Sequence, residues 1–322
     1  MNTKRNTIYA LKGLAIISVV YAHCNNRVSY NEIDALLDNL RSSFGAVGVP
    51  FFFLLSGYLF HNQKRFTEFC KSKIGIILPW LFWGTIVWGY EVLRKGLDYA
   101  SLGEWLLGIG NYLWYMRTLV IFWLIYYWIR SNKIKMLLLG AFTLLRIAVY
   151  DFHAFSFIES QTILDEFVCQ VPFFALGIVM QEVDFKSWYD KLSKILLCVM
   201  SIVGVFTILW INDFQIDDAK RGFLIYIGGL VVFAYEVLTH FFKKGIGKTL
   251  IYLGKNSFCI YLIHMPVAGI ISNIFSRSKY TLYFVPVYPL IALGLTCIGV
   301  FLLNKLFGKQ KWICKLCALE MK

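Results

Sequence analysis

Residues 8–23 read IYALKGLAIISVVYAH, an apolar run that contains two ionisable residues, Lys12 and His23. They are eleven positions apart, and at about 100° and ~1.5 Å per residue a helix returns to within roughly 20° of its starting face after ~16 Å. A helix here therefore places both on one face, one near each end of a membrane span. Ionisable groups in spanning helices are expensive and usually face the bundle interior for a functional reason. The alternative is that Lys12 snorkels to one interface and His23 merely ends the helix.

The composition indicates a membrane protein. Of the 322 residues, 58% are hydrophobic and 16% charged, and the mean hydropathy is +0.62. A soluble domain cannot cover that much apolar surface with polar groups. We therefore predict an all-α fold, a polytopic bundle of about ten transmembrane helices that forms one domain over 1–322 and ends in a short basic tail, 307–322. A membrane-spanning helix needs ~17–25 mostly apolar residues. The predicted spans are 8–24, 44–61, 74–93, 112–130, 134–150, 163–181, 194–211, 222–242, 250–271 and 283–306.

The distribution of basic residues predicts the orientation. With the N-terminus inside, the inner segments hold 20 of the 32 Lys and Arg, the outer loops hold 8, and four lie within spans. Cytoplasmic loops carry the excess of basic residues, so we expect a multi-pass protein of the cell membrane with both termini in the cytoplasm. The net charge of +13 then reflects orientation and not nucleic-acid binding. The longest polar connections, 25–43 and 94–111, fall outside, and 62–73 is predicted to be a short cytoplasmic interfacial helix.

The first span and the cysteines both agree with a multi-pass membrane protein. The first span is longer than the apolar core of a signal peptide and no small-residue cleavage site follows it, so we expect it to be retained. Most of the eight cysteines lie in predicted spans or on the reducing side, which does not indicate a disulfide framework. Cys314 and Cys317 have C-x-x-C spacing, but without a second pair or histidines this is a weak signal for zinc, and no metal site is predicted.

Ionisable residues inside the predicted spans fall into a cytoplasmic lower tier and an outer upper tier. The lower tier is Lys12 and Lys255, and the upper tier is His23, His264, Arg117 and Arg146. Few carboxylates in the spans can neutralise them. The candidates are Glu91, Glu166 and Glu236. Two interpretations of the arginines stay open: they bind substrate, or they pair with these acids or with lipid phosphates as packing devices.

Five blocks of sequence carry a resemblance to a known family. They are LKGLAIISVVYAH (11–23), GVPFFFLLSGYLF (48–60), LPWLFWG (78–84), LWYMRTL (113–119) and GKNSFCIYLIHMP (254–266). In this order they resemble the membrane-bound acyltransferase-3 family, which acylates sugars of surface polysaccharides and related glycans. The family's first span has an Arg, ten residues and a His. Here Lys12 replaces the Arg, and lysine lacks the fixed bidentate fork of arginine.

The resemblance implies an O-acyltransferase, in most members an O-acetyltransferase. The implied donor is cytoplasmic acyl-CoA, most often acetyl-CoA, and the acceptor is a glycan on the outer side or a saccharide presented on a lipid carrier. No bound cofactor is implied. Acyl transfer needs a base for the hydroxyl proton and positive charge for the developing oxyanion. An imidazole, whose ordinary pKa is ~6.5, suits the first task.

We expect His23 to be the general base, with Lys12 beneath it towards the donor. A two-step route through an acyl-imidazole on His23 is the alternative. Ser56 is a further nucleophile candidate, although it is better placed to help helix packing beside Gly57. The residues expected to contact substrates are Arg117, Arg146, Lys255, Asn256, Ser257, Tyr261, His264 and Ser56.

Two other classes of function stay open. A carrier for a lipid-linked saccharide or an anionic solute would use the basic residues as its binding site. A structural component of a polysaccharide export machine would need no histidine within the membrane. Consumption of acyl-CoA by the purified protein distinguishes the enzyme from both.

Overall fold

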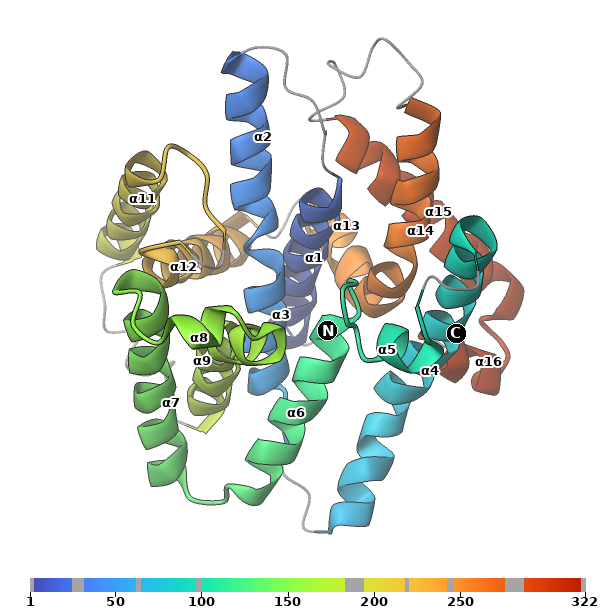
Figure 1. Ribbon diagram of the computed structural model, residues 1–322, viewed down its shortest axis with the longest axis horizontal. Coiled ribbons are helices and arrows are strands. Elements are labelled where there is room, and N and C mark those ends of the chain that lie inside the picture. The colour runs from blue at the N-terminus through green and yellow to red at the C-terminus, as the bar shows by residue number, and fades with distance from the viewer. Residues whose placement is uncertain are drawn as a thin grey trace.

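The computed structural model describes residues 3–24, 32–61, 65–96, 100–182, 194–217, 220–241, 246–275 and 287–319. Within these ranges the chain forms helices and no strand (Figure 1), which confirms the predicted all-α fold. The central helix is α1 (Thr3–His23), the segment with the two ionisable residues. It packs against helices from both halves of the chain. These are α2 (Glu32–Gly45), α3 (Gly48–Tyr58), α12 (Phe223–Phe241), α13 (Ile246–Lys255), α14 (Ser257–Phe275) and α15 (Val287–Phe307).

Glycines let α1 approach α13 closely. A Cβ built on Gly254 of α13 would lie 1.7 Å from the carbonyl oxygen of Tyr9, and one on Gly13 would lie 2.2 Å from the carbonyl oxygen of Leu250. Both distances are far inside van der Waals contact, so only glycine fits at either position. Small residues at such crossings let helix backbones approach within a membrane, where packing rather than the hydrophobic effect holds helices together.

A second crossing of the same kind joins α3 to α9 (Thr162–Glu182). A Cβ on Gly57 would lie 2.1 Å from the carbonyl oxygen of Phe174, and one on Gly177 would lie 2.0 Å from that of Leu54. Gly57 follows Ser56 in the sequence, so the expectation of close helix packing at this point of the second predicted span is confirmed. The two crossings connect α1, α3, α9 and α13 into the centre of the bundle, because α1 also packs on α3.

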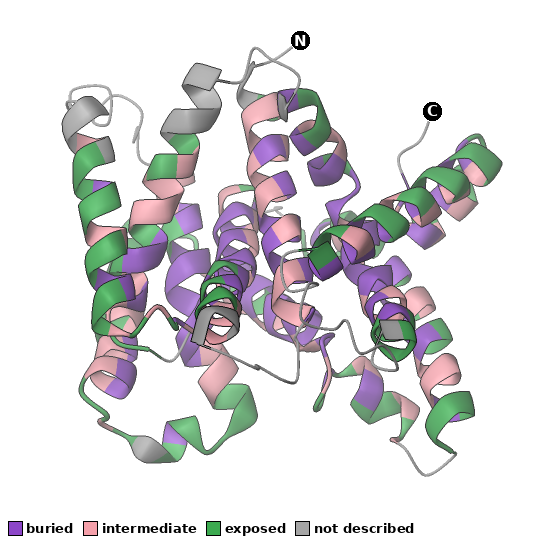
Figure 2. Ribbon diagram, turned by 90° about the horizontal axis from the view of Figure 1, so that it is seen from above, coloured by how far each residue is buried: buried purple, intermediate pink, exposed green. Residues whose placement is uncertain are grey.

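The remaining helices surround this centre. The long ones are α4 (Phe66–Lys95), α6 (Trp114–Trp128), α7 (Asn132–Arg146) and α11 (Lys194–Ile211), and the short ones are α5 (Leu102–Leu106), the π-helix η1 (Ile147–Asp151), α8 (Ser156–Glu159) and α16 (Lys311–Cys317). Figure 2 shows the buried residues gathered inside the molecule and the exposed ones on the peripheral helices. Exposed large side chains such as Trp210, Leu137 and Leu306, each about 70% exposed or more, suit contact with lipid.

Five helices of the described chain are long and apolar enough to cross a membrane. They are Ala35–Tyr58, Phe66–Lys95, Thr162–Gln181, Ser257–Ile274 and Val287–Phe307. Two shorter apolar helices are Val199–Ile211 and Phe223–Tyr235. A helix occupies part of each of the ten predicted segments, but five such helices do not establish ten spans. The difference arises because helices such as α6 and α7, at 15 residues each, are shorter than the predicted segments.

The predicted outer connection 25–43 is wrong over its second half. Residues 25–31 lie outside the described ranges, but α2 begins at Glu32 and leads through a short turn into α3, so Ala35–Tyr58 counts as one candidate span. The charged residues of α2 made this stretch look like a polar connection in the sequence. Arg41 is buried, and its guanidinium binds the Asp38 carboxylate at 2.8 Å and the carbonyl oxygen of Tyr21 at 2.6 Å, which satisfies it within the bundle.

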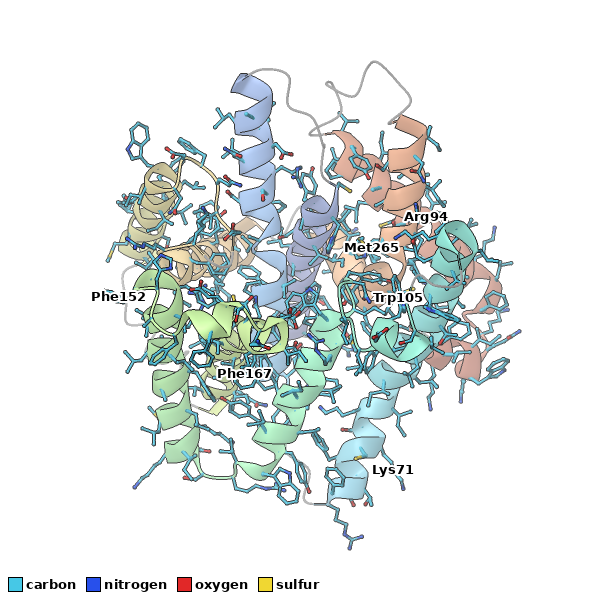
Figure 3. The ribbon with its side chains drawn as sticks, in the orientation of Figure 1. Lys71, Arg94, Trp105, Phe152, Phe167 and Met265 are labelled. Carbon is cyan, nitrogen blue, oxygen red and sulfur yellow. The ribbon has the colours of Figure 1, made fainter. Side chains whose placement is uncertain are left out.

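Two further predicted boundaries are also wrong. The expected interfacial helix 62–73 is, from Phe66 onward, the first part of the 30-residue α4, because no helix-ending residue separates its polar start from the apolar run. Figure 3 shows Lys71 and Arg94 near opposite ends of this helix. The predicted span 250–271 is interrupted at Asn256, between α13 and α14. The Asn256 amide donates to the carbonyl oxygen of Tyr252 at 2.9 Å, competing with the backbone as asparagine does at helix ends.

Candidate active site

Two histidines meet inside the bundle, although 241 positions separate them in the sequence. His23 is the last residue of α1, and His264 is the eighth residue of α14. Their ring centroids are 5.2 Å apart and the ring planes are inclined by 48°. His264 is fully buried and His23 is half-buried. In Figure 3, Met265 marks the position on α14 next to His264.

The hydrogen bonds of His264 determine which of its nitrogens carries the proton. Its Nδ1 lies 2.7 Å from the carbonyl oxygen of Tyr261. A carbonyl oxygen only accepts, so Nδ1–H donates and, in the neutral ring, Nε2 keeps a lone pair. This Nε2 is buried and has no hydrogen-bond partner among the described residues. The site therefore contains a fixed, unused acceptor beside a second imidazole.

Tyrosines pack against His264. The Tyr112 ring stands edge-on to His264 at 5.6 Å, and its hydroxyl donates to the carbonyl oxygen of Leu262 at 2.8 Å. Tyr261 returns a bond, because its hydroxyl donates to the carbonyl oxygen of Tyr112 at 2.5 Å. These reciprocal bonds join the segment that starts α6 to the first turns of α14. They hold the His264 backbone in place.

Tyr115 continues this cluster towards α3. Its ring centroid is 5.5 Å from that of Tyr261, and its hydroxyl lies 3.2 Å from Ser56 Oγ. Ser56 therefore joins the edge of the cluster through a tyrosine hydroxyl. Tyr261 and Ser56 were predicted from the sequence as site residues, whereas Tyr112 and Tyr115 were not. The signal available was that a buried phenol needs a hydrogen-bond partner, which makes tyrosines in an apolar block candidates for a polar site.

Arg117 of α6 makes an ion pair with Glu166 of α9, and both side chains are largely buried. The Thr118 hydroxyl lies 3.4 Å from the same carboxylate. Of the two interpretations left open by the sequence, this contact is the one expected of a packing device that joins two helices. Glu91 instead binds Arg94 and Lys95 along α4, at 2.7 and 3.0 Å, and the Glu236 side chain lies outside the described residues.

Arg146 is fully buried at the end of α7. Its Nε donates to the carbonyl oxygen of Cys169 at 3.2 Å, and its guanidinium lies 5.1 Å from the ring centroids of both Tyr150 and Phe223. Figure 1 shows α7 and α14 on opposite sides of the central helices, so Arg146 does not join the histidine pair.

Two cations contact Tyr9, namely Lys255 of the lower tier and Arg5. The Lys255 ammonium lies 6.0 Å from the centre of the Tyr9 ring, and Arg5 donates to the Tyr9 hydroxyl at 3.1 and 3.2 Å. Lys12 lies less than one turn further along α1 and is partly buried. No ion pair joins it to a carboxylate in the part of the chain that the structure describes.

Asn256 and Ser257 serve the break between α13 and α14. Ser257 Oγ donates to the carbonyl oxygen of Gly254 at 3.0 Å, and Asn256 Oδ1 accepts from Asn304 of α15 at 3.2 Å. Their side chains thus hold helix ends in this structure. Among the described residues, no group of three or more His, Cys, Asp or Glu side chains is arranged to hold a metal ion.

Comparison with known proteins gives one match. A family model described as an acyltransferase domain, that of the acyltransferase 3 family, matches residues 6–305. No curated protein and no solved structure matches the chain. The matched range includes α1, α6 and α14, the helices that carry His23, Tyr115 and His264, together with most of the rest of the bundle. The chain therefore belongs to the acyltransferase 3 family, and it is a membrane protein of that family.

Proposed function

We propose that the protein is an integral membrane O-acyltransferase, specifically an O-acetyltransferase. It moves the acyl group of cytoplasmic acyl-CoA, acetyl-CoA in this proposal, to a hydroxyl of a cell-envelope polysaccharide or lipid-linked glycan. The observation that carries the proposal is the pair of imidazoles, His23 and His264, 5.2 Å apart inside a helix bundle of the acyltransferase 3 family. Ionisable groups at such a depth usually serve function, because burying them is costly.

His23 is the general base in this proposal. Its imidazole takes the proton of the acceptor hydroxyl while that oxygen attacks the thioester carbonyl carbon. Collapse of the tetrahedral intermediate breaks the C–S bond, and the CoA thiolate receives the proton from His23. General acid–base catalysis of this kind typically contributes ~10²–10⁴-fold to the rate. In the alternative two-step route, His23 attacks the thioester itself and the acyl-imidazole then transfers to the acceptor.

The cations around Tyr9 suit the donor side. Arg5 and Lys255 place positive charge at Tyr9 in the first half of α1, and Lys12 adds a third cation at the middle of that helix. Phosphate groups bind such clusters of basic side chains. Along the helix axis Lys12 and His23 are ~16 Å apart. In this proposal the phosphates of acyl-CoA bind at the Lys12 end and the extended pantetheine arm carries the thioester towards His23.

The same proposal includes a topology. We infer ten spans with both termini in the cytoplasm of a cell membrane protein, because a helix lies in each of the ten predicted segments and the inner segments carry 20 Lys and Arg against 8 outside. The donor and acceptor then reach the site from opposite sides of the membrane. The shorter helices α6 and α7 would cross the membrane together with the turns before α6 and the π-helix η1 that continues α7.

The test is acyl-CoA consumption by purified protein in lipid nanodiscs. We expect release of free CoA thiol that depends on added glycan acceptor, with the acyl group recovered on the glycan by mass spectrometry. A protein that binds or transports the saccharide without consuming acyl-CoA would be a carrier, and the proposal would be wrong. Ser56→Ala tests the further nucleophile candidate. Because the Ser56 hydroxyl is bound to Tyr115, we expect this variant to keep activity within a few-fold, and abolished activity would assign Ser56 a catalytic role.

A further inference from the structure

The His264 ring contains a buried acceptor that the proposed mechanism has not used. Nε2 is out of contact with solvent and has no hydrogen-bond partner among the described residues, while Nδ1 is held by the carbonyl oxygen of Tyr261. A buried polar atom without a hydrogen-bond partner typically costs ~1–3 kcal/mol of stability. An unpartnered Nε2 in the folded protein therefore needs an explanation, and a partner that binds it during the reaction provides one. The nearest ionisable ring is that of His23.

Among the described residues, none supplies His23 with the group that usually orients a catalytic base. In many enzymes a carboxylate receives one N–H of the catalytic imidazole and so directs the other nitrogen at the substrate. No ion pair or hydrogen bond joins a carboxylate to His23 within the described chain, and Asp38, a carboxylate of the neighbouring α2, is bound by Arg41. A neutral hydrogen-bond acceptor for the His23 ring suits a site within the bundle better, because a carboxylate would bring a costly charge into the membrane.

We propose that His264 is the positioning residue for His23, with its Nε2 accepting the N–H of the His23 ring. The proposal rests on the proposed function, in which His23 is the base. A centroid separation of 5.2 Å leaves one nitrogen of each ring within reach of a hydrogen bond of about 2.9–3.0 Å once His23 turns about its side-chain torsions. Catalytic hydrogen bonds are often long or misaligned in the free enzyme and tighten when substrate binds.

This bond has two consequences for the reaction. Before proton transfer, it places the proton of neutral His23 on the nitrogen that faces His264, so that the other nitrogen presents its lone pair to the acceptor hydroxyl. After transfer, both His23 nitrogens carry protons and the bond to His264 becomes charge-assisted, which stabilises the imidazolium in a site of low polarity. His264 keeps its own Nδ1 proton throughout, and no bond to it forms or breaks.

The framework around His264 fits a positioning role. The Tyr261 carbonyl fixes the His264 tautomer, and the Tyr261 hydroxyl is bound to the Tyr112 backbone at 2.5 Å. The Tyr112 hydroxyl returns to the Leu262 carbonyl at 2.8 Å. The Tyr112 ring also stands edge-on to the His264 ring. Contacts from Tyr112, which precedes α6, therefore hold the start of α14 in place, and the Tyr261 carbonyl of α14 itself sets the protonation of His264. His23 sits at a helix end and is half-buried.

The experiment compares His264→Phe and His264→Gln in nanodiscs, with kcat and KM measured for acyl-CoA and acceptor. Phenylalanine fills the site but accepts no hydrogen bond, so we expect kcat to fall on the order of 10²-fold with both KM values close to wild type. Glutamine offers an oxygen near the position of Nε2 and should stay within about tenfold of wild-type kcat. If His264→Phe unfolds in detergent, His264→Met against His264→Gln makes the same comparison with two flexible side chains of similar size.

A double-mutant cycle shows whether His264 acts through His23. In a His23→Ala background, His264→Phe should lower the residual rate no further, because the group that it positions is absent. Three results would each overturn the proposal. They are a wild-type kcat in His264→Phe, equal losses of kcat in His264→Phe and His264→Gln, and a loss caused by His264→Phe that is as large in the His23→Ala background as in the wild type. Failure of the proposed function is a different result, since the wild-type protein would then consume no acyl-CoA.

Discussion

On the scale of single residues, Lys12 is the position where the chain departs from the pattern of its family. The charge is kept but the planar fork of arginine is lost, so a lysine here acts as a point charge. Lys12 is partly buried on α1, less than one turn from Tyr9 and the cations that contact it. No ion pair joins Lys12 to a described carboxylate, so its charge is available to an anionic substrate.

If Lys12 supplies only positive charge to the donor, Lys12→Arg should keep most activity and Lys12→Ala should lose it. The loss should be mainly a rise in KM for acyl-CoA, because the interaction is with the bound phosphates and not with the reacting carbonyl. Steady-state kinetics at equal protein abundance measure this. Full activity in Lys12→Ala would return Lys12 to the snorkelling interpretation.

The buried Arg117–Glu166 pair makes a second prediction at this scale. Glu166→Leu should destabilise the protein by about 3–5 kcal/mol, because it leaves a buried guanidinium unpaired, while Arg117→Met with Glu166→Leu should recover most of that loss. Thermal unfolding in detergent measures both. A stable double variant with impaired substrate binding would contradict the packing role and favour the substrate role first expected of Arg117.

On the scale of the elements, the apolar segments of the sequence indicated helices correctly, but several boundaries could not be predicted. The break at Asn256 depends on a bond to Asn304, which belongs to a distant helix. The extension through α2 depends on Arg41 finding acceptors on α1 and α2. Tertiary contacts of this kind satisfy polar groups that, in the sequence alone, look like the end of a span.

The crossing of α3 and α9 gives a prediction for this scale. Gly177→Ala should destabilise the bundle, because the new methyl group would sit 2.0 Å from the Leu54 carbonyl oxygen and force the helices apart. Gly140→Ala on α7 is the matched control, since its Cβ meets nothing within 4 Å, and alanine there should be neutral or stabilising by about 0.5–1 kcal/mol. Melting temperatures of the two variants in one detergent make the comparison. Equal tolerance of both substitutions would contradict the close crossing.

On the scale of the whole molecule, the sequence predicted the class of protein and placed both histidines in one tier. It could not predict that they touch, nor that Tyr112 bonds to Leu262 from 150 positions away, because these contacts depend on how the helices pack. The helical period relates residues on one helix, such as Lys12 and His23. It carries no information about which faces of two helices meet.

The proposed orientation is tested by labelling. In a background lacking Cys24 and Cys70, a cysteine replacing Lys71 should resist a membrane-impermeant thiol reagent in intact cells, and one replacing Gly103 should react. Both positions are exposed and lie in the predicted inner segment 62–73 and outer connection 94–111, so accessibility alone does not distinguish them. The opposite pattern would invert the donor and acceptor sides.

The central claim is that His23 performs acyl transfer at the membrane, and the most direct measurement is glycan acylation by His23→Ala. We expect this variant to insert, to melt near wild type and to bind acyl-CoA almost normally, because His23 is half-buried at a helix end and far along α1 from Lys12. Its rate of acyl transfer to the acceptor, measured by mass spectrometry of the glycan, should fall by ~10²–10⁴-fold or more. Acylation of the glycan by His23→Ala at close to the wild-type rate would contradict the account.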